Sequence, residues 1–270
     1  MSCQGPGKLP PPFRREDADH FFARLAAAVE RLLFLDYDGT LAPFKVDRDR
    51  AHPYPGVREA LETIQADGGT RLVIVSGRPV AEIRKLLALQ AQPELWGSHG
   101  WERIGTTGSA SSLDLPREVV AQLDAAWTLL CQHDLTDQGE RKPASVAVHW
   151  RGLAVDDVQA IRHRIQPSWQ KLARSDNLDL QAFDGGLELR ARGRDKGFAV
   201  RTVLAEAKAD AVAAYLGDDR TDEDAFRALR PRDLALLVRP QRRVTEARFW
   251  LEPPEELLGF LQRWSEAARQ

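Results

Sequence analysis

The sequence of 270 residues predicts an α/β protein with a doubly wound, mostly parallel sheet that is interrupted by an inserted α+β module. Two segments predict the parallel sheet. Residues 32–35 and 71–75 are dominated by consecutive apolar side chains, as strands buried on both faces are, and helical patterns alternate with them. Residues 144–150 predict the module, because apolar side chains alternate there as in a strand with one exposed face.

The elements of the parallel sheet are predicted on both sides of the insertion. Before it, apolar side chains at helical spacing predict helices over 16–31, 56–67 and 79–90, which alternate with strands over 32–35, 71–75 and 95–98. Pro79 suits the first position of its helix, because the N–H that proline lacks has no partner there. After the insertion, the same criteria predict helices over 195–207, 222–229 and 255–268, and strands over 211–216 and 234–238.

The insertion is predicted to be a small domain of its own. The small polar residues 105–112 predict a linker, and helices are predicted over 116–131 and 155–171. Asp184-Gly185-Gly186, between strands over 178–183 and 187–192, is typical of a β-hairpin. We therefore expect a flexible N-terminal leader over 1–15, a core over 16–107 and 191–270, and the inserted domain over 108–190.

Composition excludes several functional classes. Lys and Arg number 38 against 40 Asp and Glu, so the net charge of -2 lacks the basic excess that nucleic acids or membrane surfaces attract. No apolar run approaches the roughly 18 residues of a membrane span. Two cysteines cannot build a disulfide framework, and the N-terminus has no secretory apolar region. We expect a cytoplasmic monomer that binds neither nucleic acid nor membranes.

The first candidate site follows the first predicted strand. In Leu35-Asp36-Tyr37-Asp38-Gly39-Thr40, two carboxylates lie two residues apart at the end of the strand, where open α/β sheets bind ligands. Gly39 allows the chain to turn, so that Asp36 and Asp38 can both face the crevice. The alternative is a turn with two solvated aspartates.

A second group of acids follows a later strand, in Gly217-Asp218-Asp219-Arg220-Thr221-Asp222-Glu223-Asp224. So many carboxylates repel one another unless a cation lies among them, and hard oxygen ligands at this density suit Mg²⁺. The alternative is the N-terminal cap of a helix. Capping explains Asp222 and the acids after it better than it explains Asp218 and Asp219.

Two further segments offer groups that bind phosphoryl oxygens. Ser76-Gly77-Arg78 presents a hydroxyl and backbone N–H groups after the second strand, and Lys196 opens a helix within Asp195-Lys196-Gly197. Each segment alone is weak, because most Ser-Gly pairs are turns and most lysines are solvated. The four segments in this order indicate one site.

In this order, the segments DYDGT, SGR, DKG and GDDRTDED resemble the four motifs of the haloacid dehalogenase superfamily of phosphotransferases. The resemblance spans residues 33–224 and leaves room for a cap domain between the second and third motifs. It implies a Rossmann-like core with an inserted α+β cap of the C2B type. It also implies Mg²⁺ as the cofactor.

The resemblance implies a catalytic role for four residues. Asp36 would be the nucleophile that forms an aspartyl-phosphate. Asp38 would protonate the leaving oxygen and then activate water. Ser76 and Lys196 would hold and neutralise the phosphoryl oxygens.

The resemblance also implies a set of metal ligands. Mg²⁺ would be bound by the carboxylate of Asp36, the backbone carbonyl of Asp38 and the carboxylate of Asp218. Asp219 and Asp222 would support the metal's water ligands and the catalytic lysine without touching the ion.

Further residues resemble the trehalose-6-phosphate phosphatase family in particular. Residues 34–43, residues 217–226 and the pair His99-Gly100 are similar to those of that family. In the insertion, the pattern Glu140-x-Lys142 and the later Glu188 match positions that bind sugar hydroxyls distal to the phosphate in the family. Polar pairing of this kind discriminates among sugars better than apolar fit does. The residues implied as substrate contacts are Glu140, Lys142 and Glu188 in the insertion, and Arg78, His99 and Gly100 in the core.

Other interpretations of these residues stay open at this point. Residues 140–142 can be a solvated charge run, and His149 on an alternating strand is more often a structural hydrogen-bonding group than a ligand. The chain also departs from the usual family pattern, with Ala191 where Pro is common and Trp101 where a smaller aliphatic residue is usual.

The resemblance therefore implies a Mg²⁺-dependent phosphatase that releases trehalose and inorganic phosphate from the small molecule trehalose 6-phosphate. One alternative is a phosphatase for another glycosyl phosphate, such as a glucosyl- or mannosyl-glycerate ester. The other is a non-catalytic sugar-phosphate sensor. The presence of Asp36, Asp38, Lys196 and Asp218 argues against a sensor, which has no need of them.

Overall fold

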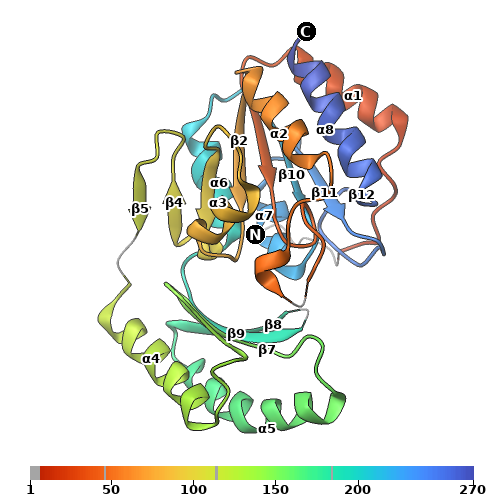
Figure 1. Ribbon diagram of the computed structural model, residues 1–270. Coiled ribbons are helices and arrows are strands. Elements are labelled where there is room, and N and C mark those ends of the chain that lie inside the picture. The colour runs from red at the N-terminus through yellow and green to blue at the C-terminus, as the bar shows by residue number, and fades with distance from the viewer. Residues whose placement is uncertain (1–6, 46, 113–114, 184) are drawn as a thin grey trace. The chain divides into compact units, whose positions relative to one another are not determined.

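A computed structural model describes residues 7–45, 47–112, 115–183 and 185–270 of the chain (Figure 1). The chain divides into two compact units. One, the core, is formed by the chain up to Ser111 together with Asp195–Gln270, and the other, the cap, is formed by Ser112–Arg194. The sequence predicted the two divisions at residues 107/108 and 190/191.

The core contains an eight-stranded sheet in the order β12-β11-β10-β1-β2-β3-β4-β5. The strands from β12 to β3 are parallel to one another, and β4 pairs antiparallel with β3. The strands are β1 (Arg31–Leu35), β2 (Thr70–Val75), β3 (Glu94–Gly97), β4 (Glu102–Ile104), β5 (Ala110–Ser112), β10 (Val212–Gly217), β11 (Leu234–Val238) and β12 (Phe249–Leu251). The mostly parallel sheet confirms the predicted α/β class.

Helices cover both faces of this sheet (Figure 1). The residues of β1 alternate between two apolar clusters, with Leu33 in the first and Phe34 in the second. The first cluster contains the apolar sides of α1 (Arg15–Ala26), α2 (Val57–Ala66), α3 (Val80–Leu87) and α8 (Glu255–Ala268). The second contains those of α6 (Lys196–Glu206) and α7 (Glu223–Ala228). Burial on both faces explains why β1 is an uninterrupted apolar run.

The register of the three central strands places their carboxyl ends side by side. Leu35 of β1 lies opposite Ile74 of β2 and Leu216 of β10. The chain leaves these strands at Asp36, Ser76 and Asp218, respectively. Three segments that are far apart in the sequence therefore meet at one edge of the sheet, as expected for a ligand site of an open α/β fold.

The cap contains a four-stranded antiparallel sheet in the order β6-β7-β9-β8. Its elements are α4 (Arg117–Gln132), β6 (Gly139–Lys142), β7 (Ser145–His149), α5 (Val155–Leu172), β8 (Leu178–Phe183) and β9 (Gly186–Ala191). Apolar residues of both the helices and the sheet are buried, among them Leu130, Trp169, Val148 and Leu189. Both helices lie on the same side of the cap sheet (Figure 1). The other face is free to carry polar side chains.

The structure corrects the N-terminal part of the sequence prediction. Residues 7–13, expected within a flexible leader, form main-chain hydrogen bonds with the segment around β12. Lys8 exchanges two with Thr245, Phe13 donates to Trp250, and Trp250 donates to Pro11. Residues 1–6 lie outside the described residues. The following helix ends at Ala26 rather than at residue 31, because Arg31 already belongs to β1.

Four short strands, β4, β5, β6 and β12, were not predicted. They are three or four residues long, too short for an alternation to stand out. Each of these strands is defined by its pairing with another strand. The sequence of the short segment itself does not indicate that pairing. Among the described helices, none combines the length and the apolar character that crossing a bilayer requires.

Candidate active site

Asp36 lies immediately after β1 and is almost fully buried, with 3% of its surface exposed. Its backbone N–H donates to the carbonyl of Leu216, 2.9 Å away, which fixes the chain as it leaves the sheet. Its Oδ1 lies 2.8 Å from Nζ of Lys196, the first residue of α6. Burial, followed by the charge of Asp222, raises the pKa of Asp36 to about 7, although Lys196 pulls in the opposite direction.

Asp222 is the centre of a buried network of hydrogen bonds. Its Oδ1 accepts from Nζ of Lys196 at 2.7 Å and from the hydroxyl of Tyr215 at 2.6 Å. Its Oδ2 accepts from the backbone N–H groups of Asp218 and Asp219 at 3.0 and 2.9 Å. Four donors thus occupy this carboxylate, so Asp222 fixes the lysine and the loop and has no oxygen left over for a cation.

Lys196 therefore stands between two carboxylates, Asp36 and Asp222, and is itself buried. Burial alone would lower the pKa of its ammonium group, but the two carboxylates outweigh burial and raise it. The lysine consequently carries a fixed positive charge beside Asp36. A charge of this kind is suited to binding an anion at the same edge of the sheet.

Asp218 has the character of a cation ligand. It is 2% exposed, and its Oδ1 is buried without a hydrogen-bond partner. Burial and the charges of Asp36, Asp222 and Asp219 raise the pKa of its carboxyl group well above the ordinary value. A buried, unpaired carboxylate oxygen is costly unless a proton or a cation accompanies it.

The donor set fits a small divalent cation. Carboxylate oxygens of Asp36, Asp218 and Asp222 all lie within 4.8 Å of one another. Since Asp222 is occupied by four donors, Asp36 and Asp218 are the two side chains available for such an ion. Hard oxygen ligands of this kind suit Mg²⁺. Asp222 stands at the N-terminus of α7 with Glu223 and Asp224 in the first turn, as the capping interpretation expected, although its side chain makes no capping bond to that helix. The capping side chain is that of Asp219, before the short helix η3 (Arg220–Asp222), which the interpretation did not expect.

Asp38 lies near the same edge and is held by Arg78. The guanidinium donates from Nε to Oδ2 at 2.6 Å and from Nη2 to Oδ1 at 2.7 Å. Gly39 follows in the left-handed region, with φ of 84°, and the carboxylate of Asp218 occupies the space that a β-carbon at this position would need. The expected residues Asp36, Asp38 and Asp218 are thus brought together by one turn and one neighbouring strand.

Ser76 is buried, and its loop is fixed from several sides. Its backbone N–H donates to Trp96, its carbonyl accepts from His99, and its Oγ accepts from the N–H of Arg78. His99 has left-handed φ and ψ of 55° and 39°, and its ring lies against Gly77. Gly100 packs closely on the carbonyl of Asp195. His99 therefore packs on the loop that contains Ser76, and Gly100 packs on the residue that precedes Lys196.

The three predicted substrate contacts of the cap meet on one face of its sheet. Glu140 of β6 and Glu188 of β9 both lie opposite Ala147 of β7, and Lys142 shares the face of Glu140. Nζ of Lys142 lies 2.9 Å from Oε1 of Glu188 and 3.5 Å from Oε2 of Glu140. We call these three residues the cap cluster.

Two further residues complete the surroundings of the cap cluster. Ser145 donates to Glu188 at 2.7 Å, and Nε2 of His149 lies 2.8 Å from Glu140, in agreement with a structural role for this histidine. Exposed fractions of 13%, 7% and 7% for the side chains of Glu140, Lys142 and Glu188 exclude a solvated charge run. Only Arg141, pointing to the other side and about half exposed, fits that alternative.

Sequence reasoning missed two residues of the core site. Tyr215 lies inside β10, in a segment that the sequence predicts only as an apolar strand, although a buried tyrosine hydroxyl requires a partner. Arg243 donates to the carbonyls of Asp218 and Asp219 at 3.3 and 2.7 Å and pairs with Glu223, so it braces the loop of acids. No local pattern around Arg243 could have indicated this contact.

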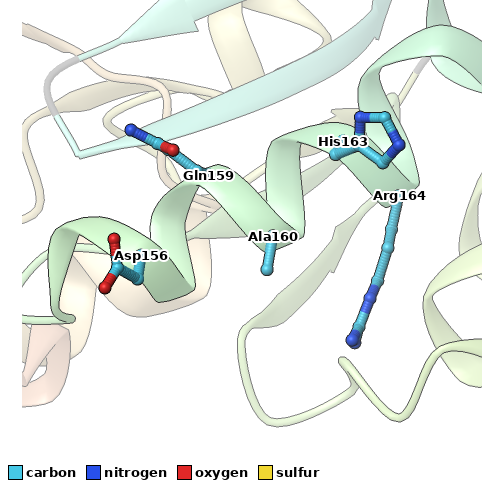
Figure 2. A pocket seen from close by; sticks show the side chains of 5 residues that line it. All are labelled: Asp156, Gln159, Ala160, His163 and Arg164. Carbon is cyan, nitrogen blue, oxygen red and sulfur yellow. The ribbon is translucent and has the colours of Figure 1, made fainter.

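A hollow on the surface of the cap lies away from the cap cluster. It is lined by Asp156, Gln159, Ala160, His163 and Arg164, which all come from successive turns of α5 (Figure 2). None of the residues predicted from the sequence as a site residue lines it. One helix face with mixed charges does not define a catalytic site.

Comparisons with known proteins agree with this arrangement. Residues 34–249 match the family model of trehalose-phosphatase. A trehalose-phosphate phosphatase of Mycobacterium marinum is 33% identical over 244 residues, which are 86% of this chain and 60% of that protein. The chain thus spans about 60% of the length of this relative.

Solved structures show the same fold. The C-terminal domain of trehalose-6-phosphate phosphatase from C. albicans superimposes with a TM-score of 0.79 at 21% identity, covering 96% of this chain and 99% of that one. A haloacid dehalogenase-like hydrolase from Bacteroides thetaiotaomicron gives a TM-score of 0.61 at 17% identity, covering 87% of this chain and 99% of that one.

The likeness to these structures shows that the chain has an α/β core with a cap, a fold that it shares with a haloacid dehalogenase-like hydrolase. This confirms the fold that the four motifs implied. More particularly, the chain belongs to the trehalose-phosphatase family.

Proposed function

We propose that the protein is a Mg²⁺-dependent phosphatase that hydrolyses trehalose 6-phosphate to trehalose and inorganic phosphate through an aspartyl-phosphate on Asp36. The observation that supports this most directly is the buried pair of Asp36 and Lys196, 2.8 Å apart and next to Asp218, in a member of the trehalose-phosphatase family. A nucleophile, a fixed positive charge and a place for a cation are the three parts that phosphoryl transfer to a carboxylate needs.

In the first half-reaction, a carboxylate oxygen of Asp36 forms a bond to phosphorus while the bond between phosphorus and the sugar oxygen breaks. Lys196 and Ser76 bind the phosphoryl oxygens and offset the repulsion between two anions. Asp38 gives a proton to the leaving sugar oxygen, so that a neutral hydroxyl departs. Trehalose is the first product.

In the second half-reaction, water attacks the phosphorus of the aspartyl-phosphate. Asp38, now a carboxylate, takes a proton from that water. The bond between phosphorus and the oxygen of Asp36 breaks, and inorganic phosphate leaves with Asp36 restored. Asp222 keeps Lys196 in place through both steps, because its own carboxylate remains bound to Tyr215 and the backbone.

Mg²⁺ would be held by the carboxylates of Asp36 and Asp218 and by the backbone carbonyl of Asp38, and when bound it supplies positive charge against the phosphoryl oxygens. The unpaired Oδ1 of Asp218 supports this assignment. Asp219 and Asp222 would not bind the ion directly. They would support the site through the loop after β10 and through Lys196.

We assign the choice of sugar to the cap cluster and the chemistry to the core. Lys142 donates, and Glu140 and Glu188 accept, so a disaccharide rich in hydroxyl groups finds both kinds of partner on one polar face. His99 and Gly100 would add contacts from the core. The proposal also includes a monomer acting in the cytoplasm on this small substrate, and the net charge of -2 offers no basic excess for nucleic acids or membranes.

Phosphate release by the purified protein tests the assignment. With Mg²⁺, trehalose 6-phosphate should react far faster than glucose 6-phosphate or a glucosylglycerate phosphate, and chelation of the metal should stop the reaction. Asp36→Asn should abolish turnover in a folded protein. A rapid-quench experiment should trap labelled phosphate on Asp36. Comparable rates on all three esters would contradict the disaccharide assignment.

A matched pair of variants tests the cap cluster. Lys142→Met should raise KM for trehalose 6-phosphate by roughly 10–100-fold, since a hydrogen bond to a charged group contributes about 1.5–3 kcal/mol. Arg141→Met is the control, because Arg141 is the neighbouring residue, is about half exposed and pairs with Asp124. Both variants should hydrolyse p-nitrophenyl phosphate as the wild type does. An equal effect of the two substitutions would contradict the assignment.

A further inference from the structure

Arg78 and Asp38 form a geometrically complete pair. Two nitrogens of the guanidinium, Nε and Nη2, donate to the two oxygens of the carboxylate, 2.6 and 2.7 Å away. Two parallel hydrogen bonds between planar groups give such a pair a defined orientation, so rotation of the carboxylate would break this pairing. The pair therefore sets the direction in which Asp38 presents its oxygens.

Arg78 is itself held rigidly. Its side chain is 2% exposed, and its third nitrogen, Nη1, lies 3.3 Å from Glu82 in the first turn of α3. The guanidinium carbon lies 5.7 Å from the centre of the Tyr37 ring. The hydroxyl of Tyr37 in turn donates to the carbonyl of Ala51, so the ring cannot swing away.

The backbone of Arg78 is fixed as well. Its N–H donates to Oγ of Ser76 at 3.1 Å, and its carbonyl accepts from the N–H of Ser98 at 2.8 Å. Ser98 has a left-handed φ of 48°, so this contact is built into an uncommon turn. Each of the three guanidinium nitrogens thus already has an acidic partner within the core.

We propose that Arg78 is a positioning residue that aims the carboxylate of Asp38 at the reacting oxygens, rather than a contact to the sugar. This inference rests on the proposed function, in which Asp38 gives a proton in the first half-reaction and takes one in the second. Misalignment by about 1 Å in such a transfer can cost about 100-fold in rate. A lysine offers one point charge instead of a planar fork and cannot replace this geometry.

Two substrates with different leaving groups separate the possible roles. Trehalose 6-phosphate has an alcohol leaving group that needs a proton, whereas p-nitrophenolate leaves without one. Arg78→Gln and Arg78→Lys should each lower kcat for trehalose 6-phosphate by about 100-fold and change KM less than about 3-fold. With p-nitrophenyl phosphate, both variants should release a rapid burst of nitrophenolate equal to the enzyme, followed by slow turnover. The burst is expected because only the hydrolysis of the aspartyl-phosphate still needs Asp38.

A double-mutant cycle shows whether Arg78 acts through Asp38. In the background of Asp38→Asn, Arg78→Gln should have no further effect on either half-reaction beyond about 3-fold. Arg103→Gln is the control, since Arg103 is also paired with two acids, Glu94 and Glu206, neither of which is a proposed site residue. It should leave both substrates unaffected. Circular dichroism checks the fold, and Arg78→Lys carries the test should Arg78→Gln fail to fold.

Three results would overturn the inference. A rise in KM for trehalose 6-phosphate with kcat retained would make Arg78 a sugar contact. Equal losses in the burst and in steady turnover would make it a general structural support. Full activity of Arg78→Lys would show that charge alone suffices. If the wild type releases no phosphate from trehalose 6-phosphate, the proposed function fails instead, and the burst experiment still tests Arg78.

Discussion

Substitution of Gly39 by alanine should separate metal binding from folding. Gly39 lies in the turn after β1, beside the loop that follows β10, and a β-carbon placed on it would be 2.2 Å from Oδ2 of Asp218. Ordinary van der Waals contact begins at 3.4 Å. The carboxylate of Asp218 must therefore retreat by roughly 1 Å, which is incompatible with the narrow range of about 2.0–2.1 Å at which Mg²⁺ binds oxygen.

A second glycine provides the control for backbone strain. Gly39 has φ of 84°, a conformation that costs a residue with a β-carbon about 1–2 kcal/mol. Gly68 has a similar φ of 69°, but a β-carbon placed on it would meet nothing within 4 Å. This strain should lower the free energy of unfolding of both alanine variants. For a unit of this size the loss corresponds to a fall of about 2–8 °C in Tm. Only Gly39→Ala should displace Asp218.

The assay is thermal unfolding at increasing Mg²⁺, with phosphate release from trehalose 6-phosphate in parallel. Binding of Mg²⁺ stabilises the native state, and the stabilisation grows with the ratio of the free Mg²⁺ concentration to its Kd. Wild type and Gly68→Ala should both gain Tm on adding Mg²⁺ and should both turn over. Gly39→Ala should do neither. A Gly39→Ala protein with the Mg²⁺ response and turnover of Gly68→Ala would refute the reasoning.

Two further predictions concern the charged networks of the core. The hydrogen bonds from Arg103 lower the pKa of Glu206 from its usual 4.5 to about 2, so its ionised form stabilises the fold above about pH 4.5 and that contribution fades as the pH falls towards 2. Glu206→Gln should accordingly be less stable than the wild type in urea at pH 7, with the difference closing near pH 2; a constant difference would contradict this. Asp222→Asn should lower the free energy of unfolding by about 3 kcal/mol or more, because Lys196 remains buried with one partner fewer. Asp19→Asn, which alters an exposed pair, should change it by less than about 1 kcal/mol, and equal losses from the two would count against a special role of the buried network.

The sequence predicts the centre of the core sheet well because burial there leaves a local record. Strands β1 and β2 are covered on both faces, which requires runs such as Leu32–Leu35. Helix α1 was predicted too long because Ala27 and Ala28 suit a helix as well as a turn. Strand β12 pairs with β11 and with residues 11–13, and neither partner leaves a pattern in the three residues of the strand.

The same distinction applies to the candidate site. Asp36 and Asp38 stand two residues apart, so their proximity can be inferred directly. Arg78 and Asp38 are 40 positions apart in the sequence, so their pairing cannot be read from spacing. The hydrogen bond from Tyr215 to Asp222 depends on how the chain turns after β10. The motifs therefore locate the chemistry, whereas the orientation of each group depends on contacts that only the folded chain creates.

The N-terminal residues that pair beside β12 have a consequence for how the molecule behaves among its own copies. An edge strand with unpaired N–H and C=O groups can pair with a strand of another chain and so promote aggregation. Here the outer edge of β12 is occupied, because the N–H of Trp250 donates to Pro11 and its carbonyl accepts from Phe13. Pro10, Pro11 and Pro12 have no backbone N–H to donate to a further strand. This segment therefore disfavours the addition of another chain at the edge of the sheet.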